Sequence, residues 1–159
     1  MSVVVHDSPI GPLTLAAEDG ALVGVWFESA SDIPGATNDR DPLLDRVRGE
    51  LDEYFAGERR EFTVALSTGG TPFQRKVWAA LQRVRYGTTT SYGAIASTIG
   101  APKAVRAVGA ANGANPIPII IPCHRIIGAN GSLTGFGGGI ERKVFLLELE
   151  AGAGRLALR

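Results

Sequence analysis

The chain has 159 residues, a formal net charge of zero and an apolar content normal for a globular protein, enough for one ordinary domain or two small ones. It contains no low-complexity tract, no apolar run long enough to cross a bilayer and no signal-peptide pattern, so we expect a folded protein without a membrane partner. One cysteine rules out an internal disulfide and predicts a reducing, cytoplasmic location. With only two histidines, we expect no metal site, and no cofactor motif is present.

The charge is divided unevenly along the chain. Residues 1–70 contain 13 Asp and Glu against 5 Lys and Arg, a net charge of −8. Residues 71–159 contain 3 against 11, a net charge of +8. This division suggests that the second half faces a polyanion such as nucleic acid. An acidic half that docks on a basic half would give the same numbers.

The first half is predicted to form an antiparallel sheet and one helix. Residues 2–7, 12–18 and 21–28 are rich in β-branched and aromatic residues and are separated by turn sequences, which predicts a three-stranded meander. Residues 42–57 have apolar residues at helical spacing, with Asp41 as the cap and Pro42 in the first turn. Residues 61–67 alternate like one more strand, and the sequence STGGT after them is the candidate domain boundary.

The second half is predicted to be mainly helical. A helix follows Thr71 and Pro72, and two short helices that begin near Ser91 and Pro102 are joined by a tight turn, which is typical of a helix-turn-helix. After them we expect an extended segment at residues 116–127, a glycine-rich loop, and a last helix that ends at Gly152.

The sequence PCHRIIG places Cys123 between a proline and two residues that can carry positive charge. A lone cysteine is more often a small buried apolar residue than a nucleophile. However, a thiol reacts as its thiolate, which a neighbouring His124 or Arg125 would stabilise, and Pro122 would hold the segment rigid. In an extended strand His124 would point away from Cys123, so the two would need a bend or a bridging water to interact.

A histidine that acts as a base usually has an acid that orients it. Glu150 is a candidate because it would lie in the last helical turn, where the helix dipole disfavours an anion without a partner. The spacing alone does not separate Glu150 from Glu148, and either could be a solvated helix end. Arg106 projects from a helix of very small residues that could approach DNA closely. Composition alone favours the other interpretation, in which this helix packs inside the protein and Arg106 is in solvent.

Together these residues make the sequence resemble the O6-alkylguanine-DNA alkyltransferases, also called methylated-DNA–protein-cysteine methyltransferases. IPCHRIIG is similar to the family's nucleophile signature, and residues 72–150 follow its order and spacing through FQRKVW, SYGAIA, APKAVRAVGAANGANPIPIIIPCHR, GSLTGFGGG and ERKVFLLELE. The resemblance implies an α+β fold with a ribonuclease-H-like domain at residues 1–70, made of an antiparallel sheet plus a helix. It also implies a mostly helical domain with a winged helix-turn-helix at residues 71–159, which would bind DNA and carry out alkyl transfer.

The resemblance implies DNA repair by direct, stoichiometric transfer of an alkyl group from O6-alkylguanine in double-stranded DNA to Cys123. The nucleotide would be flipped out through the minor groove, and the protein would act once. By position, His124 would activate Cys123 through a water, and Glu150 would orient His124. Asn115 would hold the segment that carries the cysteine, and Tyr92 would donate a proton to the departing guanine.

The same resemblance assigns the DNA-binding residues and the base pocket. Arg106 would fill the gap left by the extruded nucleotide, and the helix surface beside it would consist of Lys103, Ala104, Ala107 and Gly109. The pocket would be lined by Pro122 and by the loop from Ser132 to Gly139, including Phe136, Gly137 and Gly138. Phe136 stands where many members have tyrosine. We expect a monomer; acceptance of O4-alkylthymine and cooperative binding to DNA stay open.

Two other functions stay open from the residues alone. A cysteine hydrolase could use Cys123, His124 and Asn115, and it would turn over repeatedly. A regulator could bind DNA through the helix pair without any chemistry. Neither alternative accounts for the whole stretch from Phe73 to Glu150.

Overall fold

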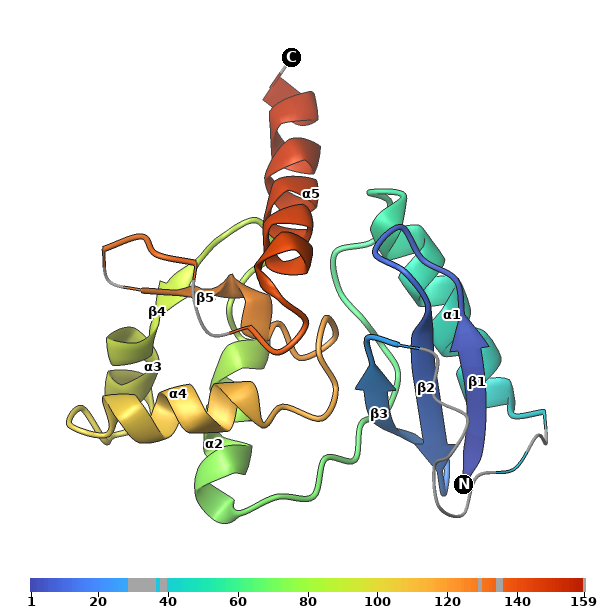
Figure 1. The fold of residues 1–159 in the computed structure, drawn as a ribbon, viewed down its shortest axis with the longest axis horizontal. Helices are drawn as coiled ribbons and strands as arrows, with labels where there is room; N and C mark the ends of the chain where they lie inside the picture. Colours follow the sequence, from blue (N-terminus) through green and yellow to red (C-terminus); the bar gives the residue numbers. More distant parts are fainter. Residues whose placement is uncertain (29–36, 38–39, 129, 134–135, 159) are drawn as a thin grey trace. The chain divides into compact units, whose positions relative to one another are not determined.

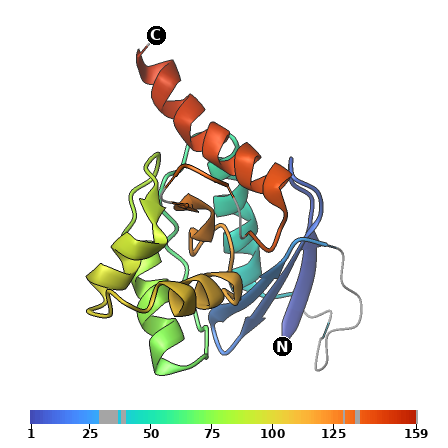
Figure 2. The same cartoon turned by 60° about the vertical axis from the view of Figure 1, so that its left-hand side comes forward.

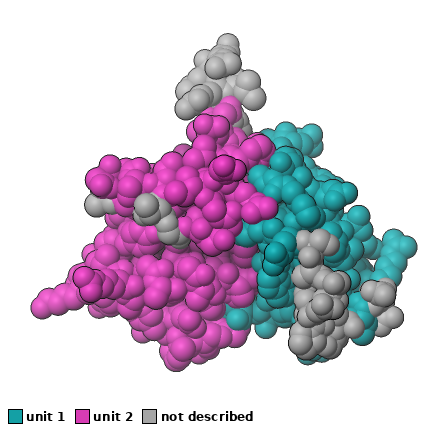
Figure 3. Space-filling model, viewed as in Figure 1, with its two compact units in different colours: residues 1–68 teal, residues 69–159 magenta. Residues whose placement is uncertain are grey.

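A computed structural model of the chain describes residues 1–28, 37, 40–128, 130–133 and 136–158, with side chains as far as residue 152. The chain divides into two compact units, residues 1–68 and residues 69–159, which Figure 3 colours teal and magenta. The first unit holds an antiparallel sheet and one helix, and the second is mostly helical, which confirms the predicted α+β fold class. No helix in the described part of the chain is long and apolar enough to span a membrane.

The sheet of the first unit is the predicted meander. Strands β1 (Ser2–His6), β2 (Leu13–Glu18) and β3 (Ala21–Trp26) lie in the order β1-β2-β3, and both pairings are antiparallel. The turn between β2 and β3 places Asp19 and Gly20 at φ values of 50° and 77°, as a two-residue hairpin turn requires. Asp followed by Gly is therefore the sequence signal that fixes this hairpin.

Helix α1 (Pro42–Phe55) covers one face of the sheet (Figures 1 and 2). As predicted, its first turn is capped by Asp41, whose side chain accepts the backbone N–H of Leu43 at 2.9 Å. The strand predicted at residues 61–67 is wrong: this stretch forms only an isolated bridge between Leu22 and Leu66. A buried side chain competes for its backbone, because Thr63 donates its N–H to Glu50 instead of to a neighbouring strand.

The second unit begins with helix α2 (Pro72–Gln82), whose cap Thr71 exchanges hydrogen bonds with Gln74. Strand β4 (Thr90–Ser91) leads into α3 (Tyr92–Thr98), and α4 (Val105–Gly113) follows after a short turn. Helices α2, α3 and α4 pack together (Figure 2), and Trp78 of α2 donates its indole N–H to the carbonyl of Ala111 in α4 at 2.8 Å. The predicted helix pair is therefore present.

The remaining elements are a 3-10 helix η1 (Cys123–Arg125), strand β5 (Ile126–Ile127) and helix α5 (Ile140–Leu158). Strand β5 pairs with β4 in parallel. Two predicted boundaries are wrong: α4 begins at Val105 rather than near Pro102, and α5 continues past Gly152 to Leu158. Glu150 is therefore not in the last turn of α5, and the argument from the helix dipole does not apply to it.

Candidate active site

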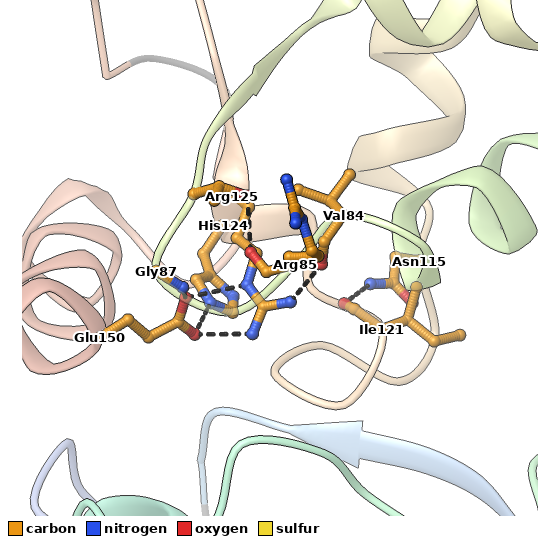
Figure 4. A network of polar contacts seen from close by, with 9 residues as sticks. Val84, Arg85, Gly87, Asn115, Ile121, His124, Arg125 and Glu150 are labelled. Carbon is orange, nitrogen blue, oxygen red and sulfur yellow. Dashed lines mark hydrogen bonds and ion pairs between the residues drawn. The ribbon is translucent and has the colours of Figure 1, made fainter. Parts of the chain in front are cut away.

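Cys123 follows a compact turn and not the extended segment that was predicted. Ile121 donates its backbone N–H to the carbonyl of Ile117 at 2.9 Å. The Asn115 side chain accepts the N–H of Ile117 at 3.0 Å. It also donates to the carbonyl of Ile121 at 2.8 Å, as Figure 4 shows. Within this turn Ile119 has a φ of 74°, which is strained for a β-branched residue. Asn115 thus binds both ends of the turn that precedes Cys123.

His124 and Glu150 meet in the interior of the second unit. The exposed fraction is 0% for His124 and 2% for Glu150, and His124 Nε2 lies 2.7 Å from Glu150 Oε2. Because Cys123 and His124 lie in a 3-10 helix, the expectation that an extended backbone points them to opposite faces does not hold. The alternative acid, Glu148, is exposed.

Glu150 also accepts hydrogen bonds from a neighbouring cation and from the backbone. Arg125 donates Nε to Oε1 at 2.8 Å and Nη2 to Oε2 at 3.1 Å, and Gly87 donates its N–H to Oε1 at 3.3 Å (Figure 4). A carboxylate that accepts this many hydrogen bonds is ionised, so the proton of the His124 contact lies on Nε2. His124 Nδ1 then carries the lone pair, and it has no hydrogen-bond partner among the described residues.

The pKa of His124 lies below its ordinary value. Complete burial lowers this pKa most, while the hydrogen bond and charge of Glu150 raise it, and Arg125 and Lys143 lower it further. The imidazole is therefore neutral at pH 7 and able to accept a proton at Nδ1.

Cys123 is only 5% exposed, and burial raises the pKa of its thiol to about 11. A hydrogen bond from Asn115, its own backbone N–H and the charge of Lys143 act in the opposite direction without overcoming burial. The expectation that His124 and Arg125 leave the thiol partly ionised is therefore wrong for this structure. The thiol is protonated at neutral pH and needs a base in order to react.

Lys143 is a buried cation on α5 beside the thiol. Its exposed fraction is 0%, and Nζ donates to the carbonyl of Ile126 at 2.6 Å. Burial lowers the pKa of Lys143, whereas a thiolate at Cys123 raises it. Since the two groups influence each other in this way, a charge that develops on the sulfur is stabilised by the ammonium group.

Tyr92 opens α3 and lies against α4. A Cβ atom placed on Gly109 would be 3.8 Å from two ring carbons of Tyr92, so the ring packs directly over this glycine. Burial raises the pKa of Tyr92, and a negative charge on Cys123 would raise it further. The phenol therefore keeps its proton at neutral pH, within electrostatic reach of the sulfur.

The predicted DNA-binding residues lie along the exposed side of α4 and just before it. Arg106 and Ala107 are exposed, as is Lys103 in the preceding turn, while Ala104 and Gly109 are partly buried. The opposite side of α4 is buried through Val108, Ala111 and Asn112. Of the predicted pocket residues, Pro122, Phe136 and Gly138 are buried, Ser132 is partly buried and Gly137 is exposed. Residues 134–135 of the same loop lie outside the described residues.

Sequence reasoning missed Arg125, Lys143 and Gly87 as parts of this cluster. The sequence motif suggests Arg125 only as a cation near the thiol and gives Lys143 no role. A signal was present for Lys143, because Lys143, Leu146 and Glu150 recur at helical spacing on one face of α5, and all three are buried. A lysine in an apolar stripe indicates a buried cation with a specific partner.

The sequence is similar to a known protein family and to several of its members. A family model described as "6-O-methylguanine DNA methyltransferase, DNA binding domain" matches residues 72–152, and one described as "6-O-methylguanine DNA methyltransferase, ribonuclease-like domain" matches residues 3–68. The chain is 55% identical over 146 residues to a methylated-DNA–protein-cysteine methyltransferase of Mycobacterium tuberculosis, covering 91% of this chain and 88% of the relative. It is 44% identical over 151 residues to the constitutive enzyme of that name from Bacillus subtilis, covering 91% and 92%.

A solved structure is also similar over nearly its whole length. The crystal structure of Mycobacterium tuberculosis OGT in complex with DNA has a TM-score of 0.89 and 51% sequence identity to this chain. The match covers 96% of this chain and 94% of that one.

Proposed function

The chain belongs to the 6-O-methylguanine DNA methyltransferase family, and from this premise we propose that it repairs DNA by moving an alkyl group from O6-alkylguanine to Cys123. The observation that carries the proposal is the cluster in which the only cysteine adjoins a neutral histidine held by an ionised glutamate. This is the arrangement of a nucleophile, its base and the group that orients the base.

The proposed reaction is a single displacement. His124 Nδ1 takes the thiol proton, directly or through one water, and the sulfur of Cys123 attacks the alkyl carbon. The S–C bond forms while the C–O6 bond breaks, and Tyr92 gives a proton to the departing guanine. Lys143 stabilises the sulfur while it carries negative charge. The product is a thioether, which no residue of the cluster can hydrolyse, so each molecule reacts once.

The proposed DNA interface is the α3–α4 pair. The small residues on the exposed side of α4 allow its backbone to approach the minor groove closely, and Arg106 takes the place of the flipped nucleotide. The excess of basic residues after residue 70 would supply phosphate contacts, so DNA affinity should fall steeply with salt. We assign residues 71–159 to DNA binding and transfer, and residues 1–70 to a supporting domain.

The mass of the intact protein tests the proposal. After incubation with duplex DNA that contains O6-methylguanine, the protein should gain the mass of one methyl group, located on Cys123, and the reaction should stop at one product per protein. Cys123→Ala should bind the same duplex normally and gain no mass. A progress curve that continues beyond one product per protein would favour a cysteine hydrolase, and unchanged mass would favour a DNA-binding regulator.

A further inference from the structure

Arg125 is a buried cation of the second unit that has no role in the proposed reaction. It makes several polar contacts. It is 6% exposed, and its guanidinium grips both oxygens of Glu150. Its Nη1 donates to the carbonyl of Val84 at 2.6 Å, and its Cζ lies 5.7 Å from the centre of the Tyr86 ring. Arg125 thus connects η1 to α5 and to the segment between α2 and β4, as Figure 4 shows for its polar contacts.

A buried ion pair of this kind is weak support for stability, because desolvation of both charges offsets much of their attraction. The two-pronged contact is nevertheless geometrically specific, since the planar fork of arginine matches the two oxygens of a carboxylate. Such a contact fixes the orientation of Glu150, and through it the orientation of the His124 ring.

Glu150 contacts both His124 and Arg125, and these two contacts have opposite effects on the protonation of His124. Its contact with His124 favours the protonated imidazolium, which could not accept a proton from the thiol. The positive charge of Arg125, which contacts the same carboxylate, partly cancels this negative charge. The carboxylate therefore raises the pKa of His124 less than it would alone. With the arginine present, Glu150 holds the Nε2–H tautomer of His124 without drawing a second proton onto Nδ1.

Resting on the proposed function, we propose that Arg125 is a positioning residue for alkyl transfer. It fixes the carboxylate of Glu150 and offsets its charge, so that His124 stays neutral and its Nδ1 can receive the thiol proton. The other titratable groups near the pair are the neutral thiol of Cys123 in η1 and the ammonium group of Lys143 in α5. The charged side chains of α2, Arg75 and Lys76, are exposed.

The protonation of His124 can be followed directly, because the chain has only two histidines. The two imidazole signals are resolved by NMR in isotope-labelled protein, and the variant His6→Gln identifies the signal of His124. In the unchanged protein His124 should be neutral above about pH 6.5, the ordinary pKa of histidine. In Arg125→Gln the midpoint of its titration should rise by about one pH unit, because the charge of Arg125 no longer offsets that of Glu150.

A second variant at this position separates the charge of Arg125 from its two-pronged geometry, and a variant at an exposed arginine serves as the control. Arg125→Lys keeps the positive charge but loses the fork, so the His124 midpoint should stay near its original value while the transfer rate falls about tenfold. Arg83→Gln removes an exposed arginine at the end of α2 and should change neither quantity. Rates are measured with the free alkylated base, so that DNA binding does not enter, and are normalised to the fraction of protein that finally gains mass.

An unchanged His124 midpoint in Arg125→Gln overturns the proposal, as does a normal transfer rate in Arg125→Lys. If Arg125→Gln does not fold, Arg125→Lys decides alone through its midpoint and rate. A purely structural role would lower stability in both variants and leave the titration where it was. The titration needs no alkylated DNA, so an unchanged protein that gains no mass would contradict the proposed function without affecting this measurement.

Discussion

Among the described residues, each unit buries one glutamate. The two glutamates have similar hydrogen-bond partners, but we expect only the second to act in the reaction. Glu50 in α1 is 4% exposed, accepts the backbone N–H of Thr63 at 2.8 Å and lies 3.6 Å from Arg46. Glu150 in α5 is 2% exposed and likewise accepts a backbone N–H and an arginine. The difference is the third partner, which is the Thr63 hydroxyl for Glu50 and the imidazole of His124 for Glu150.

This difference shows how a structural carboxylate can be told from a functional one. The partners of Glu50 are a hydroxyl, a backbone group and two arginines that reach the surface, so its contacts only join α1 to the segment after it. The partners of Glu150 include a group that can change its protonation state beside the only thiol of the chain. Burial alone does not identify a site; burial next to a titratable group and a nucleophile does.

The largest difference between the two units is expected in the transfer rate when each buried glutamate is replaced by glutamine. Glu150→Gln should lower the transfer rate about 100-fold or more, because His124 loses the group that sets its tautomer. Glu50→Gln should leave the rate per folded molecule unchanged and lower the free energy of unfolding by about 2 kcal/mol. Single-turnover kinetics and urea unfolding measure the two effects. Equal losses of rate in both variants would remove the distinction.

A smaller contrast is expected for exposed arginines in the two units. Arg106→Ala should slow the reaction of duplex DNA about tenfold, since the inserted side chain no longer offsets the cost of flipping the nucleotide. Its reaction with the free alkylated base should not change. Arg40→Ala, which removes an exposed cation from the first unit, should affect neither substrate. Similar losses on both substrates in Arg106→Ala would contradict its assigned role.

Acid should weaken the first unit through Glu50. Burial raises the pKa of Glu50, but the hydrogen bonds from Thr63 and the charges of Arg59 and Arg46 outweigh burial and bring the pKa below its ordinary value. Because the folded-state pKa is depressed, the stabilisation is present above the unfolded pKa of about 4.3 and is lost as pH falls through the lower folded value. The gap in unfolding free energy between the unchanged protein and Glu50→Gln should therefore narrow below about pH 4. A constant gap down to about pH 2 would contradict this.

The smallest difference is expected between two glycines that share the same left-handed backbone conformation. Gly57 in the first unit and Gly87 in the second have φ values of 77° and 78°. Alanine at either position should cost about 1 kcal/mol of unfolding free energy. Only Gly87→Ala should also slow transfer, because relief of the strain of alanine at this φ would move the backbone N–H that residue 87 donates to Glu150. A slower reaction in Gly57→Ala would argue against this local explanation.

Local signals were sufficient to predict most of the fold. The caps Asp41, Thr71 and Ser91 mark helix starts that the structure confirms, and the Asp19–Gly20 pair marks the hairpin. The two wrong predictions of extended structure share one cause, which is a side chain that takes the backbone hydrogen bonds of the segment. Glu50 takes the backbone of the predicted strand at residues 61–67, and Asn115 folds the predicted extended segment into a turn.

The candidate site was predictable in its residues but not in its electrostatics. The resemblance indicated Cys123, His124 and Glu150, and the structure brings His124 and Glu150 into contact. The neutral state of His124 and the high pKa of the Cys123 thiol follow from burial, which local spacing does not reveal. The two-pronged contact of Arg125 with Glu150 joins residues that are far apart in the sequence. The roles of Asn115, Tyr92 and Arg106 in the reaction stay predictions.

The small sheet of the first unit has one more consequence, for behaviour at high concentration. Strand edges with free backbone groups can pair with other molecules and seed fibrils. Both edges of this sheet are partly occupied: Thr37 exchanges backbone hydrogen bonds with Met1 and Val3 beside β1, and Ala65 and Ser67 bind both backbone groups of Leu22 in β3. Short pairings of this kind interrupt the edges at little structural cost, so the sheet offers a poor template for aggregation.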